Sequence, residues 1–284
     1  MPRNHGKRRN AHSRSGHPQE GGSPAEHRQK HHSGPRHPNK GHGTEGQGVW
    51  LWGIHPVEAA LANPERKLIE LLATENAASR LPAGSPRPHI VSPKEIDTRL
   101  PPGSVHQGLA LRAEPLDPLA LEDLIEDGVE RIVVLDQVSD PHNLGAIYRS
   151  AAAFGFGGLV LQTRNAPPIT GIVAKSAVGA IETVAEARVV NISRALEQLG
   201  EAGYHTVGLA GEGEADIAQA VKGAGKLAIV LGAEGPGLRP GVAKACAELA
   251  RIPISSAMES LNVSNAAAIA FYEAARSRYI HLSA

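Results

Sequence analysis

Short apolar runs recur along the second half of the chain and alternate with longer stretches of mixed polarity. The runs cover residues 131–138, 158–162, 183–190, 205–210, 226–231 and 250–254. Because these runs carry no polar face, they are typical of parallel strands buried between two layers of helices. The stretches between and after them predict helices over residues 144–154, 172–181, 192–202, 215–221 and 263–279. The pattern therefore predicts an α/β fold.

A shorter alternation of the same kind precedes this region. We expect a helix after His55-Pro56, a strand at 68–73, a helix near 93–100 that starts from Ser92, and a strand within 106–111. These elements predict a small α/β domain over residues 47–112. Residues 113–126 are rich in Pro, Asp and Glu and are interpreted as a linker, which leaves residues 127–284 as the larger domain.

The first 46 residues differ from the rest of the chain. They contain three apolar side chains, nine Lys and Arg, three Glu and eight of the fourteen histidines. A segment of this composition buries too little apolar surface to offset its ordering entropy, so we expect a disordered basic tail. Its charge suits a tether to RNA, and a plain solvated tail is the alternative. The histidines are irregularly spaced, and no metal is expected.

Composition excludes several classes of protein. The 284 residues carry zero formal net charge and one cysteine, Cys246, so there is no disulfide scaffold and no zinc site built from several cysteines. No apolar run approaches the ~18 residues of a membrane helix. The charged, non-apolar start argues against a secretory signal peptide, and we expect a cytoplasmic protein without membrane attachment.

The larger domain lacks the phosphate-binding signatures of common nucleotide folds. It contains neither a G-x-x-x-x-G-K-[ST] loop nor a G-x-G-x-x-G turn after its first strand, so an ordinary dinucleotide fold is disfavoured. Its glycines gather instead in residues 231–238, where Glu234 stands among Gly232, Gly235 and Gly237. Glycines there allow tight turns and close approach of a ligand to the backbone, although an ordinary strand-to-helix turn could also explain them.

Two further segments concentrate polar residues at predicted helix starts. Residues 140–150 include Asn143, which we interpret as a helix N-cap, and Arg149 on the following helix. Ser260, Asn262 and Ser264 precede the last helix, and each could cap it. One cap needs one such residue, so the surplus predicts a polar pocket at that helix start.

Together these segments resemble three motifs of the SpoU–TrmH family of RNA ribose 2′-O-methyltransferases. Residues 140–155 (DPHNLGAIYRSAAAFG), 231–239 (LGAEGPGLR) and 252–268 (IPISSAMESLNVSNAAA) match in order, and the resemblance spans about residues 129–280. Residues 48–112 are similar to the small substrate-binding domain of the RlmB-type branch, which methylates a guanosine ribose in 23S rRNA. The resemblance implies a trefoil-knotted parallel sheet, S-adenosylmethionine as methyl donor, and a homodimer.

The resemblance also implies roles for individual residues. The positions that match catalytic or substrate-positioning residues are Asn143, Arg149, Glu234, Ser260 and Asn262. The positions that match the cofactor site are Ala210, Gly211, Gly232, Ile252, Leu261 and Ser264. Ser255-Ser256 and Asn265 depart from the family pattern without removing a polar group of a motif.

The expected chemistry is in-line attack of a ribose hydroxyl on a methyl group, which positioning accelerates. Arginine stays protonated in proteins, so we assign Arg149 to stabilising the developing oxyanion, and Glu234 or a substrate phosphate to accepting the proton. Two alternatives stay open: methylation of a tRNA or of another rRNA nucleotide, and a non-catalytic RNA-binding paralogue.

Overall fold

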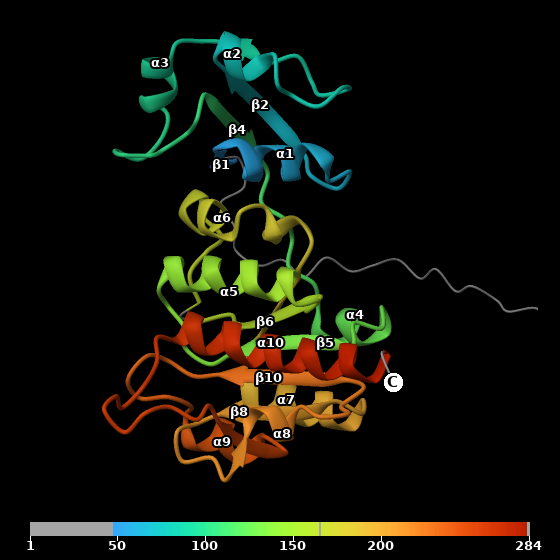
Figure 1. Cartoon of the computed structure of the whole chain (residues 1–284). Helices are drawn as coiled ribbons and strands as arrows, with labels where there is room; N and C mark the ends of the chain where they lie inside the picture. The colour runs from blue at the N-terminus through green and yellow to red at the C-terminus, as the bar shows by residue number, and fades with distance from the viewer. Residues whose placement is uncertain (1–47, 165, 283–284) are drawn as a thin grey trace, which may run out of the picture. The chain divides into compact units, whose positions relative to one another are not determined.

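The computed structural model describes residues 48–164 and 166–282, with side chains described up to Arg276. The predicted tail over residues 1–46 lies outside the described residues. Two separate sheets are present in the described part, one of four strands and one of seven. The predicted small and large α/β regions each contain one of them (Figure 1).

The small sheet has the strand order β1-β4-β2-β3. Its strands are β1 (Val49–Trp52), β2 (Leu68–Ala73), β3 (His89–Ile90) and β4 (Leu109–Ala113). β4 pairs antiparallel with β1 and with β2, while β3 runs parallel to β2. Three helices accompany them: α1 (Ile54–Ala62), α2 (Glu75–Ala78) and α3 (Pro93–Asp97). The Ser92 side chain accepts a hydrogen bond from the N–H of Glu95, so it caps α3 as its sequence predicts.

The large sheet has seven strands, all paired in parallel, in the order β7-β6-β5-β10-β8-β11-β9. Its strands are β5 (Arg131–Leu135), β6 (Gly158–Gln162), β7 (Ala185–Val189), β8 (His205–Leu209), β9 (Ala215–Asp216), β10 (Leu227–Leu231) and β11 (Glu248–Arg251). Every residue of β5 and of β10 is buried, as strands covered on both faces require. The α/β prediction is confirmed.

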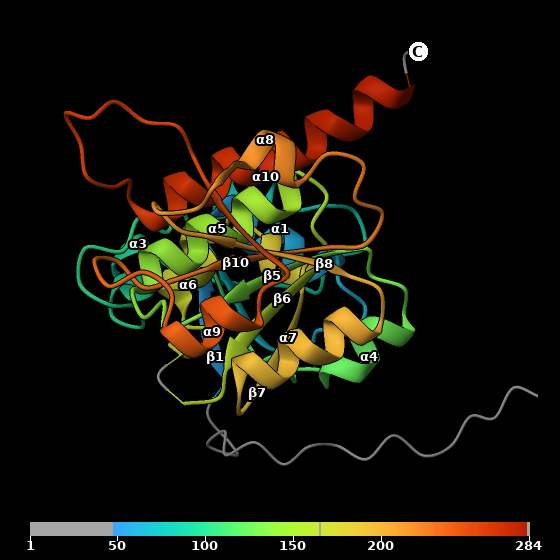
Figure 2. The same cartoon turned by 90° about the horizontal axis from the view of Figure 1, so that it is seen from below.

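Helices cover both faces of the large sheet, and alternate strand residues point to each layer. One layer contains α5 (Pro141–Ala153), α8 (Ile217–Ala220) and α10 (Val263–Leu282), packed on strand residues such as Val133 and Ile229, while α6 (Gly171–Ala177) packs on α5 and β1. The other contains α4 (Leu121–Glu126), α7 (Ile192–Glu201) and α9 (Pro240–Ala245), packed on Ile132 and Ala228. Figure 2 shows the strands between these two layers.

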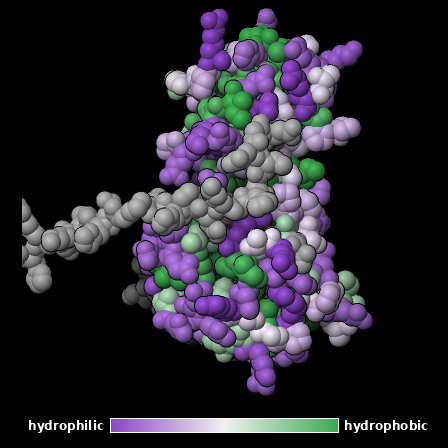
Figure 3. All heavy atoms as spheres, turned by 180° about the vertical axis from the view of Figure 1, so that it is seen from behind, coloured by the Kyte–Doolittle hydropathy of each residue, from purple (hydrophilic) through white to green (hydrophobic). Residues whose placement is uncertain are grey.

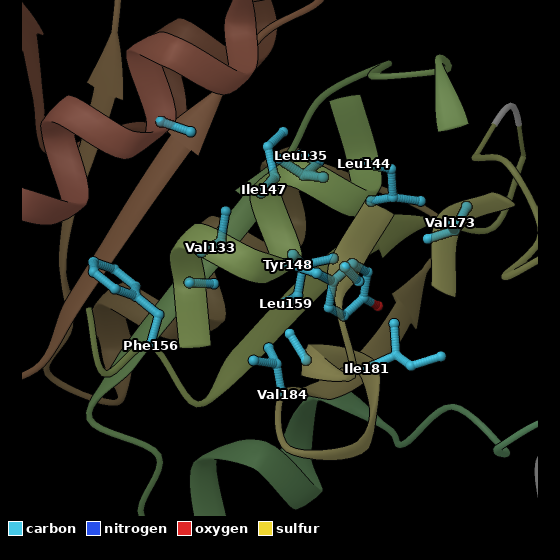
Figure 4. Packing of buried hydrophobic residues seen from close by; sticks show 14 of the residues in the cluster. Val133, Leu135, Leu144, Ile147, Tyr148, Phe156, Leu159, Val173, Ile181 and Val184 are labelled. Atoms are coloured by element: carbon cyan, nitrogen blue, oxygen red, sulfur yellow. The ribbon is translucent and has the colours of Figure 1, made fainter. Parts of the chain in front are cut away.

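The first layer holds the bulkiest part of the core. Phe156 packs against Phe271 of α10 with ring centroids 4.4 Å apart, and Tyr148 of α5 is 1% exposed among aliphatic side chains (Figure 4). The Tyr148 hydroxyl donates a 2.6 Å hydrogen bond to Glu186, and burial raises the pKa of Tyr148 well above its ordinary value. This tyrosine therefore stays a neutral donor, which satisfies its one polar atom inside the core.

Some boundaries differ from the sequence predictions for local reasons. The helix predicted over 172–181 ends at Ala177 because Val178 and Gly179 both adopt positive φ, and a short 3-10 turn (Ala180–Glu182) follows. The helix predicted over 215–221 is α8 preceded by the two-residue strand β9. Residues 113–126, interpreted as a linker, begin with the last residue of β4 and include α4, which buries Leu121 and Leu124.

No helix in the described part of the chain is long and apolar enough to cross a membrane. The face shown in Figure 3 is mainly hydrophilic, with smaller hydrophobic patches between the polar side chains.

Candidate active site

The predicted site residues gather at one edge of the large sheet. In a parallel sheet the carboxyl ends of all strands meet at the same edge, and ligands bind there where the strand order reverses direction. Ala210 and Gly211 follow β8, Gly232 follows β10, and Ile252 follows β11. These strands are neighbours in the order β10-β8-β11, so the predicted cofactor residues share one stretch of this edge.

Three side chains from distant parts of the chain form a hydrogen-bonded cluster at this edge. Oε1 of Glu234 accepts hydrogen bonds from Nδ2 of Asn143 at 3.0 Å and from Nδ2 of Asn262 at 2.6 Å. Nδ2 of Asn262 also lies 3.1 Å from Oδ1 of Asn143. The three predicted motifs therefore converge on a single carboxylate, and Glu234 remains exposed at the surface.

Asn143 reaches the cluster from inside α5 and is not the cap of that helix. Asp140 is the N-cap, because its side chain accepts from the N–H of His142, and Pro141 occupies the first helical position. The interpretation of Asn143 as the N-cap is wrong. With Asp140 as the cap, the Asn143 side chain is left to contact Glu234.

Asn262 performs two tasks at the start of α10. Its Oδ1 accepts hydrogen bonds from the N–H of Ser264 at 2.9 Å and from the Ser264 hydroxyl at 2.6 Å, which caps the helix. Its amide nitrogen faces the other way, towards Glu234. The cap fixes the rotamer of Asn262 and so aims its donor at the carboxylate.

The turn that carries Glu234 is closed by its own backbone. Ala233 and Gly237 exchange two hydrogen bonds, of 3.1 Å and 3.0 Å. A Cβ atom on Gly232 would lie 2.1 Å from the carbonyl carbon of Gly237, so only glycine fits where the two arms meet. The glycine cluster in the sequence is therefore explained by a tight turn that presents Glu234.

The edge beside this turn fits a bound nucleoside better than a metal ion. A Cβ atom on Gly211 would meet no atom within 4 Å, and the apolar side chains of Ile252 and Leu261 are half-buried. Backbone groups and apolar side chains of this kind suit a largely uncharged aromatic ligand. In the part of the chain that the structure describes, no group of His, Cys, Asp and Glu could hold a metal ion.

Two predicted catalytic residues lie outside the cluster. Arg149 is exposed on α5, six residues beyond Asn143, and makes no ion pair with any residue of the described ranges. Ser260 is exposed in the loop before α10 and makes no hydrogen bond with any described residue. Within residues 48–164 and 166–282, no hydrogen bond or ion pair directs either side chain towards Glu234.

The sequence reasoning missed a fully buried carboxylate beside the site. Asp136 follows β5 directly and binds Arg239, the last residue of the second motif, through Nε at 2.8 Å. The signal was an aspartate that ends an apolar strand without a partner nearby in the sequence. Its partner lies 103 residues away, which no local pattern reveals.

Comparisons with known proteins agree with this arrangement. Residues 130–272 match the SpoU rRNA Methylase family, and residues 50–119 match the domain described as RNA 2′-O ribose methyltransferase substrate binding. The 23S rRNA (guanosine-2′-O-)-methyltransferase RlmB of Vibrio cholerae is 37% identical over 243 residues, which is 80% of this chain and 96% of that protein. The RlmB protein of Coxiella burnetii is 36% identical over 241 residues, with 80% and 95% covered.

A solved structure has the same fold. The AdoMet-bound rRNA methyltransferase from Sinorhizobium meliloti superposes with a TM-score of 0.68 at 27% identity, covering 81% of this chain and 87% of that one. The match spans both sheets, and the family match covers the strands and loops that hold Asn143, Glu234 and Asn262. From its sequence, its fold and the convergence of its three motifs, this chain belongs to the SpoU rRNA methylase family.

Proposed function

We propose that this chain transfers a methyl group from S-adenosylmethionine to the 2′-hydroxyl of a guanosine ribose in 23S rRNA. The observation that carries the proposal is the convergence of Asn143, Glu234 and Asn262 at the carboxyl edge of the sheet, beside the glycine-rich turn. The substrate is taken from the RlmB relatives of Vibrio cholerae and Coxiella burnetii, whose names specify it and of which this chain covers 96% and 95%.

Ala210, Gly211, Gly232, Ile252 and Leu261 would hold the methyl donor, and Ser264 supports Asn262 beside them. When bound there, S-adenosylmethionine supplies an electrophilic methyl group. The chain's own residues must then hold the ribose oxygen in line and take its proton as the new oxygen–carbon bond forms.

Glu234 is suited to take that proton. Both amide donors bind its Oε1, so its Oε2 has no hydrogen bond to the described residues and can face the ribose hydroxyl. A substrate phosphate is the alternative acceptor. Asn143 and Asn262 orient the carboxylate and exclude other rotamers.

We assign Arg149 to the oxyanion, in a homodimer. Ala153, Ile269 and Tyr272 are exposed on α5 and α10, and Tyr272 touches Phe154 edge-on with centroids 6.0 Å apart, so the two helices form one partly apolar face. A second copy covering this face would bury it symmetrically. Arg149 lies one helical turn before Ala153 and would then sit at the interface, within reach of a partner's site.

The proposed knot is supported by strand order. β11 pairs with both β8 and β9, although β8 and β9 follow one another in the chain and β11 comes later. A later segment inserted between consecutive earlier strands is the arrangement that a threaded chain produces.

We also propose the domain division and location. The small sheet belongs to an RNA-binding domain over residues 47–112, and the catalytic domain occupies residues 127–284. The intervening α4 packs on the catalytic domain through Leu121 and Leu124, which contact the cluster around Ile132. The basic tail over residues 1–46 is proposed to tether RNA. An rRNA substrate and a single cysteine favour the cytoplasm.

The test is transfer of labelled methyl groups from S-adenosylmethionine to total RNA that lacks this modification. Alkaline hydrolysis maps the label, because a 2′-O-methyl group blocks cleavage at its own linkage. Label on one guanosine ribose of 23S rRNA is expected. Label on tRNA or another rRNA nucleotide would keep the reaction and overturn the substrate. No label on any free RNA, with the methyl donor still bound, would point to an RNA-binding role or to a pre-ribosomal particle as the substrate.

A further inference from the structure

We infer that Asp136 and Arg239 form a clamp that positions Glu234 for catalysis. The inference rests on the proposed methyl transfer, and it concerns two residues to which neither the motifs nor the comparisons assign a role. Both are positioning residues, because neither touches Glu234, Asn143 or Asn262 directly.

The clamp closes around a carboxylate that has no exposed surface. Asp136 is 0% exposed and accepts three contacts from Arg239: from the backbone N–H at 3.0 Å, from Nε at 2.8 Å and from Nη2 at 2.5 Å. Side-chain and backbone donors of one residue thus bind both carboxylate oxygens. A buried carboxylate has lost its contacts with water and needs several donors in their place. Because these donors must meet its oxygens at set positions, they fix the geometry of the pair.

The pair joins the ends of the turn that holds Glu234. Asp136 donates its own N–H to the carbonyl of Leu231 at 2.8 Å, at the last residue of β10. Arg239 is the N-cap residue of α9, at the far end of the turn. The same aspartate therefore binds the chain just before the turn and just after it, while Ala233 and Gly237 close the turn from within.

A residue of a third strand, β6, also binds the Arg239 side chain. Nη2 of Arg239 donates to Oε1 of Gln162, the last residue of β6, at 3.3 Å. These contacts therefore hold the turn in place relative to β5, β6 and β10, which are neighbours in the sheet. Glu234 is exposed and would otherwise move with a glycine-rich loop, so these contacts fix where its free oxygen points.

The test is a double-mutant cycle between Arg239 and Glu234, with turnover measured on the full-length protein. Arg239→Lys keeps the charge and the backbone donor but removes the fork that holds Asp136. Because lysine keeps a positive charge for Asp136 and the Arg239 side chain is 40% exposed, Arg239→Lys is not expected to unfold the protein. Arg188→Lys on the outermost strand β7 is the control, since Arg188 makes a comparable Nε contact of 2.6 Å with Glu186.

We expect Arg239→Lys to lower kcat about 10- to 100-fold with little change in the affinity for the methyl donor. In a Glu234→Gln background the same substitution should change kcat less than about twofold, because the acceptor that it positions is already absent. Arg188→Lys should leave kcat unchanged in both backgrounds. A merely structural role for the pair predicts the same loss in both backgrounds and would overturn the inference, as would wild-type kcat in Arg239→Lys.

If Arg239→Lys lowers the stability of the protein, hydrogen exchange can distinguish loosening of the turn from loosening of the whole sheet. The amide hydrogens of Ala233 and Gly237 should exchange faster in Arg239→Lys, while those of β6 and β7 keep their wild-type rates. Equal acceleration in all of these amides would mean general loosening and would overturn the clamp. Wild-type methyl transfer, measured in parallel, separates failure of this inference from failure of the proposed function.

Discussion

Two amide groups bind Oε1 of Glu234, so the proposed role of Oε2 as proton acceptor can be tested by a substitution that keeps Oε1. Glu234→Gln keeps an oxygen that can accept both bonds, so the cluster with Asn143 and Asn262 should persist. The substitution removes only the ability to take a proton. We expect kcat to fall about 10²- to 10⁴-fold with the methyl-donor affinity retained, measured by label transfer and calorimetry. A loss below about tenfold would assign the proton to a substrate phosphate.

Arg149 differs from Glu234 because no hydrogen bond or ion pair with the described residues fixes its side chain. A planar guanidinium binds an oxyanion through paired donors, which a lysine ammonium does not reproduce. Arg149→Lys should therefore lower kcat by about 10²-fold without changing the thermal unfolding midpoint. Arg276→Lys, on an exposed pair with Glu273, serves as the matched control. Near-wild-type turnover in Arg149→Lys would contradict the specific guanidinium role.

Cys246 is the one thiol in the chain, and its surroundings keep it unreactive. Burial, together with the nearby Asp136 carboxylate, raises the pKa of Cys246 to about 12. At pH 8 only about one thiol in 10,000 is then ionised, and alkylation requires the thiolate. Iodoacetamide should therefore leave the folded protein unlabelled at pH 8 and label it fully in denaturant.

The raised pKa of Cys246 also makes the stability of the folded protein depend on pH. In the unfolded chain the thiol ionises near its ordinary pKa of about 8.5, well below its pKa in the folded protein. Cys246 therefore contributes its full stabilisation of the folded protein below about pH 8.5. This stabilisation declines as the pH rises towards 12. Rapid alkylation of the native protein at pH 8 would contradict the burial of Cys246.

At the scale of elements, Asn262 at the start of α10 both caps the helix and binds Glu234. Asn262→Ser keeps a side-chain oxygen for the cap but cannot reach Glu234, whereas Asn262→Ala loses both functions. We expect both variants to lose turnover, and only Asn262→Ala to lose about 1 kcal/mol of unfolding free energy. Denaturant unfolding and label transfer distinguish the two effects. Equal stability of the two variants would mean that Asn262 does not cap the helix.

Elements with a strong local signal could be predicted from the sequence, and contacts between distant ones could not. The buried strands β5 and β10 and the cap at Ser92 follow from apolar runs and from helix-start chemistry. The pairing of Asp136 with Arg239 does not, because 103 residues separate the partners. The cap at Asn143 was misassigned because several polar residues compete at that helix start, and Asp140 followed by proline prevails.

At the scale of the whole molecule, a buried ion pair joins the segment after α1 to the 3-10 turn at Ala180–Glu182. Arg66 follows α1 and contacts Glu182 through Nη2 at 2.6 Å, with side chains 2% and 3% exposed. Asn63 donates to the same glutamate at 2.8 Å. Because these polar groups are withdrawn from water, each depends on the others for compensation.

Removing one member of that pair should cost more than removing both. We expect Arg66→Met to lower the unfolding free energy by about 3–5 kcal/mol, because Glu182 is left as an uncompensated buried charge. The double variant Arg66→Met/Glu182→Leu should recover much of that loss. Chemical denaturation measures both, and a double variant as unstable as Arg66→Met would contradict this account.

The position of β11 has a consequence for the timing of synthesis. This strand lies between β8 and β9, which leave the ribosome first, so the sheet has an open slot until the later residues arrive. The loop after β11 carries Ile252, Leu261 and Asn262, so these residues are also synthesised after the helix of Asn143 and the turn of Glu234. A chain that stops before Asn262 lacks one of the two amide donors to Glu234. We therefore expect a partly synthesised chain of that length to be unable to methylate RNA.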